Sequence, residues 1–476
     1  MNGNGVPRKL ARKVAWAVAM STAAYGIEAI WEDQAWLLNG FHRLTTEIGR
    51  RVAGTFSSTK GEDAIRAADI PPTRPALDRR RERLLSAALS ATPDAPKRAL
   101  IPVAATDDSS RSRVSTWFRE ASRNLLKEGQ QVEKTSPMRR HRTPWHPPEG
   151  PTLHAWTDGS FRKSAGVGWV ISSSNDGSGE IIAWDSKSLG GMHTAFDAEV
   201  TAIQLAIYWF ITNRHGARSL VVHSDSTSAI ERAAHTGAGP GQSQARKIQR
   251  WVQALARQST PRWVNIEWVK GHAGTPGNER ADALAGSAAE TAGPYSPVMS
   301  LAFLKMRISD KFRTAKDGWH NDPSNHGLAE IPPPPPKKSM LDRARNAIAR
   351  TAAQIRTGHW RSAVYLKRIR KPGYTEDACW FCNDGKTMSR SHVLLHCKNP
   401  KIAGARLEAW EGKNPGGVRV LLANPRWERR FVRFLELSGV GRTMKDGTDE
   451  ESAYATRMDG WVAWEARRGR EERGEG

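Results

Sequence analysis

The spacing of hydrophobic residues along this chain changes from a helical period to a strand period and back. Between residues 152 and 291, short apolar or alternating runs predict five strands. They cover residues 153–156, 166–171, 181–187, 220–222 and 263–269, with a turn at Gly159 directly after the first. Helical spacing predicts helices over 195–212 and 244–256, and another helix that begins near Asn278. This stretch is therefore expected to be an α/β domain.

Four acidic residues lie beside these predicted strand ends or in first helical turns. They are Asp158, Glu199, Asp225 and Asp282. Such positions converge where an α/β sheet usually places its site. A buried group of carboxylates is unfavourable unless a positive charge compensates it, and Mg²⁺ prefers oxygen ligands. Each acid alone has an ordinary explanation as a cap or a solvated loop charge, but together they predict a metal site. Asp197 and Glu279 are interpreted as exposed charges.

Residues 152–291 resemble a type-1 ribonuclease H domain. The matching segments are Thr-Asp-Gly-Ser at 157–160, Ala-Glu at 198–199, Ser-Asp-Ser at 224–226, Gly-His-Ala-Gly at 271–274 and Asn-Glu-Arg-Ala-Asp at 278–282. The resemblance implies an α/β, ribonuclease H-like fold with a mixed five-stranded sheet and flanking helices. It also implies endonucleolytic hydrolysis of the RNA strand of an RNA–DNA hybrid, with two Mg²⁺ ions as cofactors, Mn²⁺ as an alternative, and 5′-phosphomonoester products.

The resemblance also implies a role for each matched residue. Asp158 would ligate both metal ions, Glu199 and Asp225 one each, and Asp282 would complete the second metal site. Glu199 would lie near the attacking water. His272 matches a mobile histidine that assists proton movement and product release. The chain departs from bacterial members between the second and third helices, where 236–241 replaces a basic, Trp-rich protrusion.

The three cysteines form a different pattern. They lie in Cys379-Trp-Phe-Cys382 and in a His392-Val-Leu-Leu-His396-Cys397 run. A disulfide framework would need more cysteines and an even number of them. Cys379, Cys382, His392 and Cys397 have instead the spacing of a structural Zn²⁺ site, a zinc knuckle over 373–400. His396 is an alternative fourth ligand, and three buried thiols without metal are the alternative to any site.

Charge separates the predicted nuclease from its flanks. The chain carries a net charge of +23. Residues 151–292 hold 13 basic and 12 acidic side chains, whereas residues 293–476 hold 34 and 21. We therefore expect the flanks to bind nucleic acid. Most of the 19 tryptophans are expected to serve packing, and Trp169, Trp184, Trp209 and Trp268 fall at positions that should face the core.

The flanks resemble a non-LTR retrotransposon protein. Residues 12–31 and 77–89 are similar to helices that follow the polymerase palm there, and residues 354–366 with the cysteine segment are similar to its end. The only Asp-Asp pair, at 107–108, lies in a polar loop. The resemblance thus implies the C-terminal part of a reverse transcriptase polyprotein without its palm, which could associate with a missing polymerase domain.

Composition gives the remaining boundaries. Residues 1–98 are expected to be helical, 99–150 a basic, Pro-rich linker, 300–372 a basic helical region with a polyproline spacer at 332–336, and 401–476 helical and then a disordered, charged tail. The apolar run at 14–24 is too short to cross a bilayer, so no membrane association is expected. We expect an intracellular location, in the nucleus or the cytoplasm. A catalytically idle nucleic-acid-binding remnant is the alternative function.

Overall fold

The computed structural model describes residues 7–31, 33–91, 149–213, 216–291, 299–325, 339–382 and 384–442. The predicted spacer at 332–336, the tail beyond residue 442 and nearly all of the predicted linker at 99–150 lie outside these ranges. The chain divides into two compact units, of which unit 2 spans Arg79–Lys311 and unit 1 combines Met1–Asp78 with Phe312–Gly476. In the described ranges, no helix is long and apolar enough to cross a membrane.

Unit 2 contains one mixed sheet of five strands in the order β3-β2-β1-β4-β5. The strands β1, β2 and β3 are antiparallel neighbours, whereas β1–β4 and β4–β5 are parallel pairs. This confirms the predicted mixed five-stranded sheet. The elements are β1 (Thr152–Phe161), β2 (Ala165–Ser172), β3 (Ile181–Gly190), α9 (Ala195–Thr212), β4 (Ser219–Ser224), α10 (Thr227–Ala233), α11 (Gln242–Ala256), β5 (Trp263–Trp268) and α12 (Pro276–Glu290).

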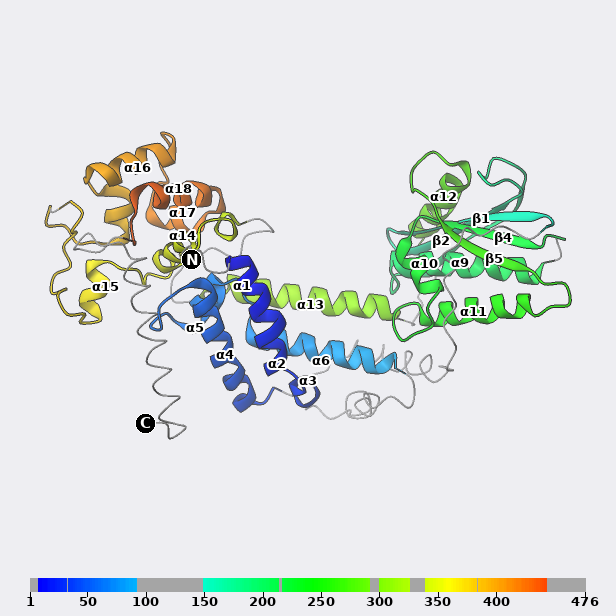
Figure 1. The fold of residues 1–476 in the computed structure, drawn as a ribbon, viewed down its shortest axis with the longest axis horizontal. Helices are drawn as coiled ribbons and strands as arrows, with labels where there is room; N and C mark the ends of the chain where they lie inside the picture. The colour runs from blue at the N-terminus through cyan, green and yellow to red at the C-terminus, as the bar shows by residue number, and fades with distance from the viewer. Residues whose placement is uncertain are drawn as a thin grey trace, which may run out of the picture. The chain divides into compact units, whose positions relative to one another are not determined.

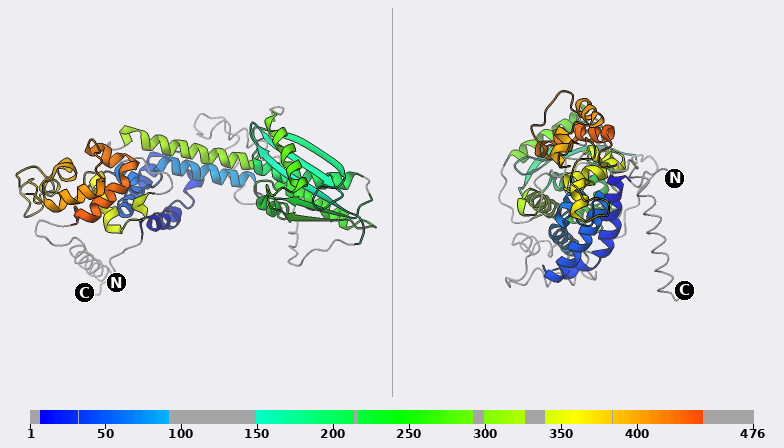
Figure 2. Two further views of the ribbon diagram at one scale, coloured as in Figure 1. Left: turned by 90° about the horizontal axis from the view of Figure 1, so that it is seen from above. Right: turned by 90° about the vertical axis from the view of Figure 1, so that its left-hand side faces the viewer.

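Helices cover both faces of this sheet. In Figure 1, α9, α10 and α11 lie on one side of the strands and α12 lies on the other, and Figure 2 shows the sheet from further directions. Val200, Ile203, Ile207 and Phe210 of α9 are fully buried against the sheet. Gly166 and Gly168 of β2 allow α12 to approach, because a Cβ atom at either position would collide with the α12 backbone.

Two sequence expectations about the strands of unit 2 are wrong. Gly159 does not end the first strand: β1 continues to Phe161, with Gly159 opposite Val167. Trp184 and Trp268 are not in the core, since they are 63% and 57% exposed. Both lie on edge strands, β3 and β5, where the alternation of side chains directs residues towards surface that the helices leave open.

Unit 1 is helical in its described part, and it brings together segments that are far apart in sequence. Arg12 forms an ion pair with Asp342 at 3.0 Å, and Gln354 Nε2 donates to the Gly54 carbonyl at 2.9 Å. Arg356 and Glu428, both buried, lie 3.5 Å apart. The helices that precede residue 73 therefore share a unit with the C-terminal segment, whereas most of the helix predicted at 77–89 belongs to unit 2. Two helices, α6 and α13, cross the boundary between the units.

The elements outside the sheet domain are α1 (Arg8–Val14), the π-helix η1 (Ala15–Met20), α2 (Ser21–Ala23), α3 (Ile27–Ile30), α4 (Ala35–Ala53), α5 (Gly61–Ala67), α6 (Thr73–Leu89), α13 (Leu301–Asn321), η3 (Pro323–Asn325), η4 (Met340–Asp342), α14 (Asn346–Arg356), α15 (Ala363–Arg368), the π-helix η5 (His392–His396), α16 (Pro400–Trp410), α17 (Val418–Ala423), η6 (Pro425–Trp427) and α18 (Glu428–Ser438).

Candidate active site

The parallel pairing of β1 and β4 places two of the predicted acids side by side. Thr157 on β1 is opposite Ser224 on β4, so the next residues of each strand, Asp158 and Asp225, are neighbours. Glu199 lies just after the first turn of α9, not within it as expected, and it reaches the same place. Oxygen atoms of Asp158, Glu199 and Asp225 lie within 4.8 Å of one another. Three carboxylates that are far apart in sequence thus form one cluster.

Missing side chains make this convergence possible. A Cβ atom at residue 159 would collide with the backbone of Glu199, so a glycine is required for α9 to approach β1 this closely. A Cβ at Gly271 would likewise collide with the carboxylate of Asp225. The glycines of the two matching motifs therefore set the separation of the elements that carry the acids.

The cluster is electrostatically strained in the absence of a cation. Burial, reinforced by the charges of Asp225 and Asp282, raises the pKa of Asp158 to about 6. Burial, reinforced by Asp158 and Asp225, raises the pKa of Glu199 to about 9. Glu199 Oε2 is buried and accepts no hydrogen bond from any described residue. An oxygen-only donor set with an unsatisfied buried oxygen fits a hard divalent cation, which would supply the missing positive charge.

The remaining predicted residues lie next to this cluster. Asp282 of α12 groups with His272 and Glu279, with one ligand atom of each within 4.8 Å of the others. Asp282 raises the pKa of Asp158 and His272 lowers it, so both act on the same carboxylate. His272 is exposed and has a left-handed backbone, with φ of 49°. Glu279 is exposed, as expected, yet it belongs to this group because it lies three residues before Asp282 on the same helix.

Asp197 differs from its expected role. It is buried rather than exposed, because it forms a capping box with Thr194 at the start of α9 and accepts a hydrogen bond from Ser300 Oγ at 2.6 Å. A Thr followed three residues later by an acidic residue is a sequence pattern that indicates such a capping box. This cap fixes the helix turn that carries Glu199.

Trp268 is a neighbour of the site that the sequence did not reveal. Its indole Nε1 donates to the carbonyl oxygen of Asp225 at 3.1 Å, and the next residue, Val269, donates its N–H to the Ser224 carbonyl at 3.0 Å. The end of β5 therefore holds the backbone around Asp225 by two hydrogen bonds. Since Trp268 is largely exposed, its position is explained better by this contact than by burial.

The four predicted zinc ligands form a second cluster, in unit 1. Cys379, Cys382, His392 and Cys397 each offer a ligand atom within 4.8 Å of the others. A bridge between Ala378 and Thr387 closes the turn that carries the first two cysteines. Cys382 Sγ lies 3.3 Å from His392 Nε2, whereas the His396 side chain is exposed. Three sulfurs and one imidazole nitrogen fit Zn²⁺, and Val393 and Leu394 pack inward as predicted.

Comparison with known proteins places the sheet domain in a family. The RNase H family matches residues 151–290. A ribonuclease H of Maricaulis maris is 32% identical over 146 residues, which are 28% of this chain and 89% of that protein. The chain belongs to the RNase H family.

Other RNase H relatives match shorter or more divergent stretches. A ribonuclease H of Bordetella bronchiseptica is 51% identical over 47 residues, 10% of this chain, so the chain spans only 30% of that relative's length. The solved structure of RNase H1 from the archaeon Halobacterium salinarum is 27% identical and covers 29% of this chain and 98% of its own, with a TM-score of 0.23.

The raised pKa of Glu199 predicts how the RNase H domain responds to pH without metal. The folded state holds the Glu199 proton up to about pH 9, whereas an unperturbed Glu releases it near 4.5. Raising the pH through this window therefore destabilises the fold. In chelator, the free energy of unfolding of the wild type should decrease when the pH is raised from about 5.5 to about 8.5. This decrease should exceed that of Glu199→Gln by on the order of 2 kcal/mol. Urea denaturation at both pH values measures this, and parallel pH profiles would contradict it.

The contact of Trp268 predicts an effect on cation binding. Trp268→Phe removes the N–H donor but keeps an aromatic ring, so the Asp225 backbone should be held less firmly. We expect Mg²⁺ to bind about 3-fold more weakly, as the removal of a hydrogen bond worth roughly 0.5–1 kcal/mol implies. The Mg²⁺ concentration that gives half of the thermal stabilisation measures this. Trp263→Phe is the matched control on the same strand, because the Trp263 indole N–H bonds to no described residue; equal midpoints for both variants would reject the role.

Proposed function

We propose that residues 151–290 hydrolyse the RNA strand of RNA–DNA hybrids endonucleolytically. The convergence of Asp158, Glu199 and Asp225 where β1 runs beside the end of β4 carries this proposal. Membership of the RNase H family, and the position of Asp282 and His272 beside the cluster, support it. None of the four acids of the family motif is missing from this chain.

Two Mg²⁺ ions, or Mn²⁺, would be held by the carboxylates and would supply an activated water and charge neutralisation at the scissile phosphate. Asp158 would be the shared ligand, Glu199 and Asp225 would hold one ion each, and Asp282 would complete the second set. The water oxygen forms a new bond to phosphorus and the 3′-oxygen leaves, which yields a 5′-phosphomonoester and a 3′-hydroxyl. Glu199 orients the water, and exposed His272 exchanges protons with solvent as the leaving group departs.

A catalytically idle, nucleic-acid-binding domain is the second candidate function. Two departures from relatives favour weaker hybrid binding: Ala195 stands where many have an Asn that reads ribose hydroxyls, and the 236–241 turn replaces the basic protrusion. Neither touches the carboxylate cluster. Weaker binding caused by Ala195 or by the 236–241 turn would therefore raise the hybrid concentration needed for cleavage, but it would not abolish cleavage.

We also propose a context for the domain. Zn²⁺ in the Cys379, Cys382, His392 and Cys397 cluster would be structural, because four protein ligands leave no open position for chemistry. Together with the flanking helices, this fits a retrotransposon-derived protein that acts inside the cell, in nucleus or cytoplasm, and associates with a polymerase domain.

Asp158→Asn tests the nuclease proposal directly. The substitution removes the ligand shared by both ions, so hybrid cleavage should fall by at least about 1,000-fold, while hybrid binding in chelator stays within about 2-fold. A labelled hybrid, double-stranded RNA and a DNA duplex of one sequence are incubated with Mg²⁺ and with chelator. Only the hybrid with Mg²⁺ should be cut. An inert wild type would favour the idle alternative, and equal cutting by the variant would place the activity elsewhere.

Metal analysis tests the zinc proposal. The full chain should contain about one Zn²⁺, and His392→Ala should lose most of it, because a tetrahedral site needs all four ligands. His396→Ala is the matched control and should retain zinc, since that side chain lies outside the cluster. Zinc content is measured by elemental analysis after gel filtration. Loss in the control variant, or a metal-free wild type, would contradict the assignment.

A further inference from the structure

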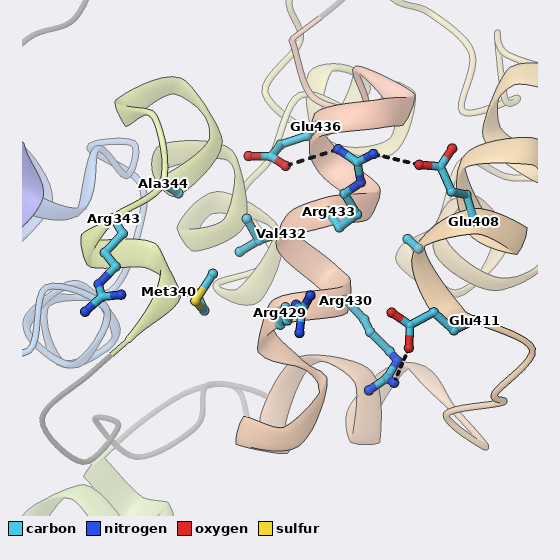
Figure 3. A pocket seen from close by; sticks show the side chains of 11 residues that line it. Met340, Arg343, Ala344, Glu408, Glu411, Arg429, Arg430, Val432, Arg433 and Glu436 are labelled. Atoms are coloured by element: carbon cyan, nitrogen blue, oxygen red, sulfur yellow. Dashed lines mark hydrogen bonds and ion pairs between the residues drawn. The ribbon is translucent and has the colours of Figure 1, made fainter.

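A hollow in unit 1, far in sequence from the nuclease motifs, is bordered by an unusual number of arginines. It has a volume of about 370 Å³ and lies between α16, α18 and the segment around η4 (Figure 3). We call it the arginine hollow; its lining residues are Met340, Arg343, Ala344, Glu408, Ala409, Glu411, Arg429, Arg430, Val432, Arg433 and Glu436. Its floor includes apolar side chains, of which Met340 is 37% exposed.

The arginines of the hollow fall into two classes. Arg430 is paired with Glu411 and Arg433 with Glu408, each at 2.7 Å, and these pairs connect α18 to α16 and its C-cap. Arg433 also lies 4.0 Å from Glu436 of α18. The guanidinium groups of Arg343 and Arg429 are different, because neither makes a hydrogen bond or an ion pair with any residue in the described ranges. Both side chains are exposed, and Figure 3 shows them on opposite sides of Met340. Ion pairs between helical segments explain the positions of Arg430 and Arg433, but they do not explain Arg343 and Arg429.

The arginines of α18 and its approach also share one helix face. Arg429, Arg430 and Arg433 of α18 are spaced by one and three residues, the pattern of neighbours on an α-helix, and Arg426 lies on η6 directly before it. From Arg426 to Arg433 the helical backbone rises about 10 Å, the axial distance over which one strand of a duplex presents about three phosphates. Guanidinium groups bind phosphate oxygens in a bidentate manner. The stripe therefore has the length and chemistry to follow a nucleic-acid backbone.

We propose that the arginine hollow, with the α18 stripe, binds the phosphodiester backbone of a nucleic acid independently of base sequence. Arg343 and Arg429 contact phosphate oxygens, and the exposed Met340 packs against a sugar. Glu408 and Glu411 lower the affinity, because they neutralise Arg433 and Arg430. The proposal goes beyond the nuclease function, since it involves no residue of 151–290 and does not require cleavage.

The test uses the full chain in chelator, so that cleavage cannot affect binding. The probes are a fluorescent DNA duplex, the matched RNA–DNA hybrid and single-stranded RNA, each titrated at several salt concentrations. Arg343→Gln with Arg429→Gln should weaken binding of at least one probe about 10-fold or more at low salt. It should also reduce the slope of log affinity against log salt by about 1.8, or 0.9 for each phosphate that the protein no longer neutralises. Arg43→Gln on α4, combined with Arg419→Gln on α17, removes the same charge from exposed arginines that pair with no described residue and lie outside the hollow, and it should change neither value by half as much.

A second variant guards against weaker binding through misfolding. Glu408→Gln with Glu411→Gln frees Arg430 and leaves Arg433 only its 4.0 Å ion pair with Glu436, so it should tighten binding about 3-fold or more. A misfolded protein would not gain affinity. Tightening by this variant and weakening by the Arg343 and Arg429 variant support the site. The proposal is overturned if the Arg343 and Arg429 variant binds all three probes as tightly as the control variant does. An acidic protein then becomes the better partner for this surface.

Discussion

Mutual repulsion among buried carboxylates is the constraint around which unit 2 is organised. Asp158 and Asp225 are neighbours because β1 and β4 run parallel, and Glu199 joins them because glycine at 159 lets α9 come close. The raised pKa values of Asp158 and Glu199 measure the energetic consequence. A fold that concentrates negative charge in this way trades stability for a place where a cation binds strongly, as functional sites commonly do.

The supports of the cluster come from several distant parts of the domain. The capping box of Thr194 and Asp197 sets the start of α9, the end of β5 holds the Asp225 backbone, and α12 brings Asp282 from the opposite face. Each acid is thus positioned by an element that is held through contacts outside the carboxylate cluster. Such pre-organisation lets ligands meet a cation without a large rearrangement.

Much of unit 2 could be predicted from its sequence, because its strands and helices have clear periods and its motifs have fixed order. The helix at 195–212 is found with the predicted bounds, and β4 and β5 differ from the predicted strands by one or two residues at an end. The prediction that the first strand ends at Gly159 is wrong, because the sequence does not distinguish a glycine that ends a strand from one that lets a neighbouring helix approach. Asp197 and Trp268 were misplaced for a related reason: burial depends on partners such as Ser300 and Asp225, which lie 103 and 43 residues away. Nothing in the local pattern at 12 or 342 indicates that these residues pair across the chain.

The pairing of the first and last helical segments into unit 1 has a consequence for synthesis of the protein. Residues 8–78 leave the ribosome long before the partners at 339–442 exist, whereas all strands of unit 2 are available once residue 290 has emerged. The sheet domain is therefore complete first, while the apolar cluster of residues 20–77, which holds Phe41 and Ile65, still lacks Ala353, its buried member from the later segment. During this interval Arg12 and the Gly54 carbonyl also have to wait for Asp342 and Gln354, their partners in the finished unit.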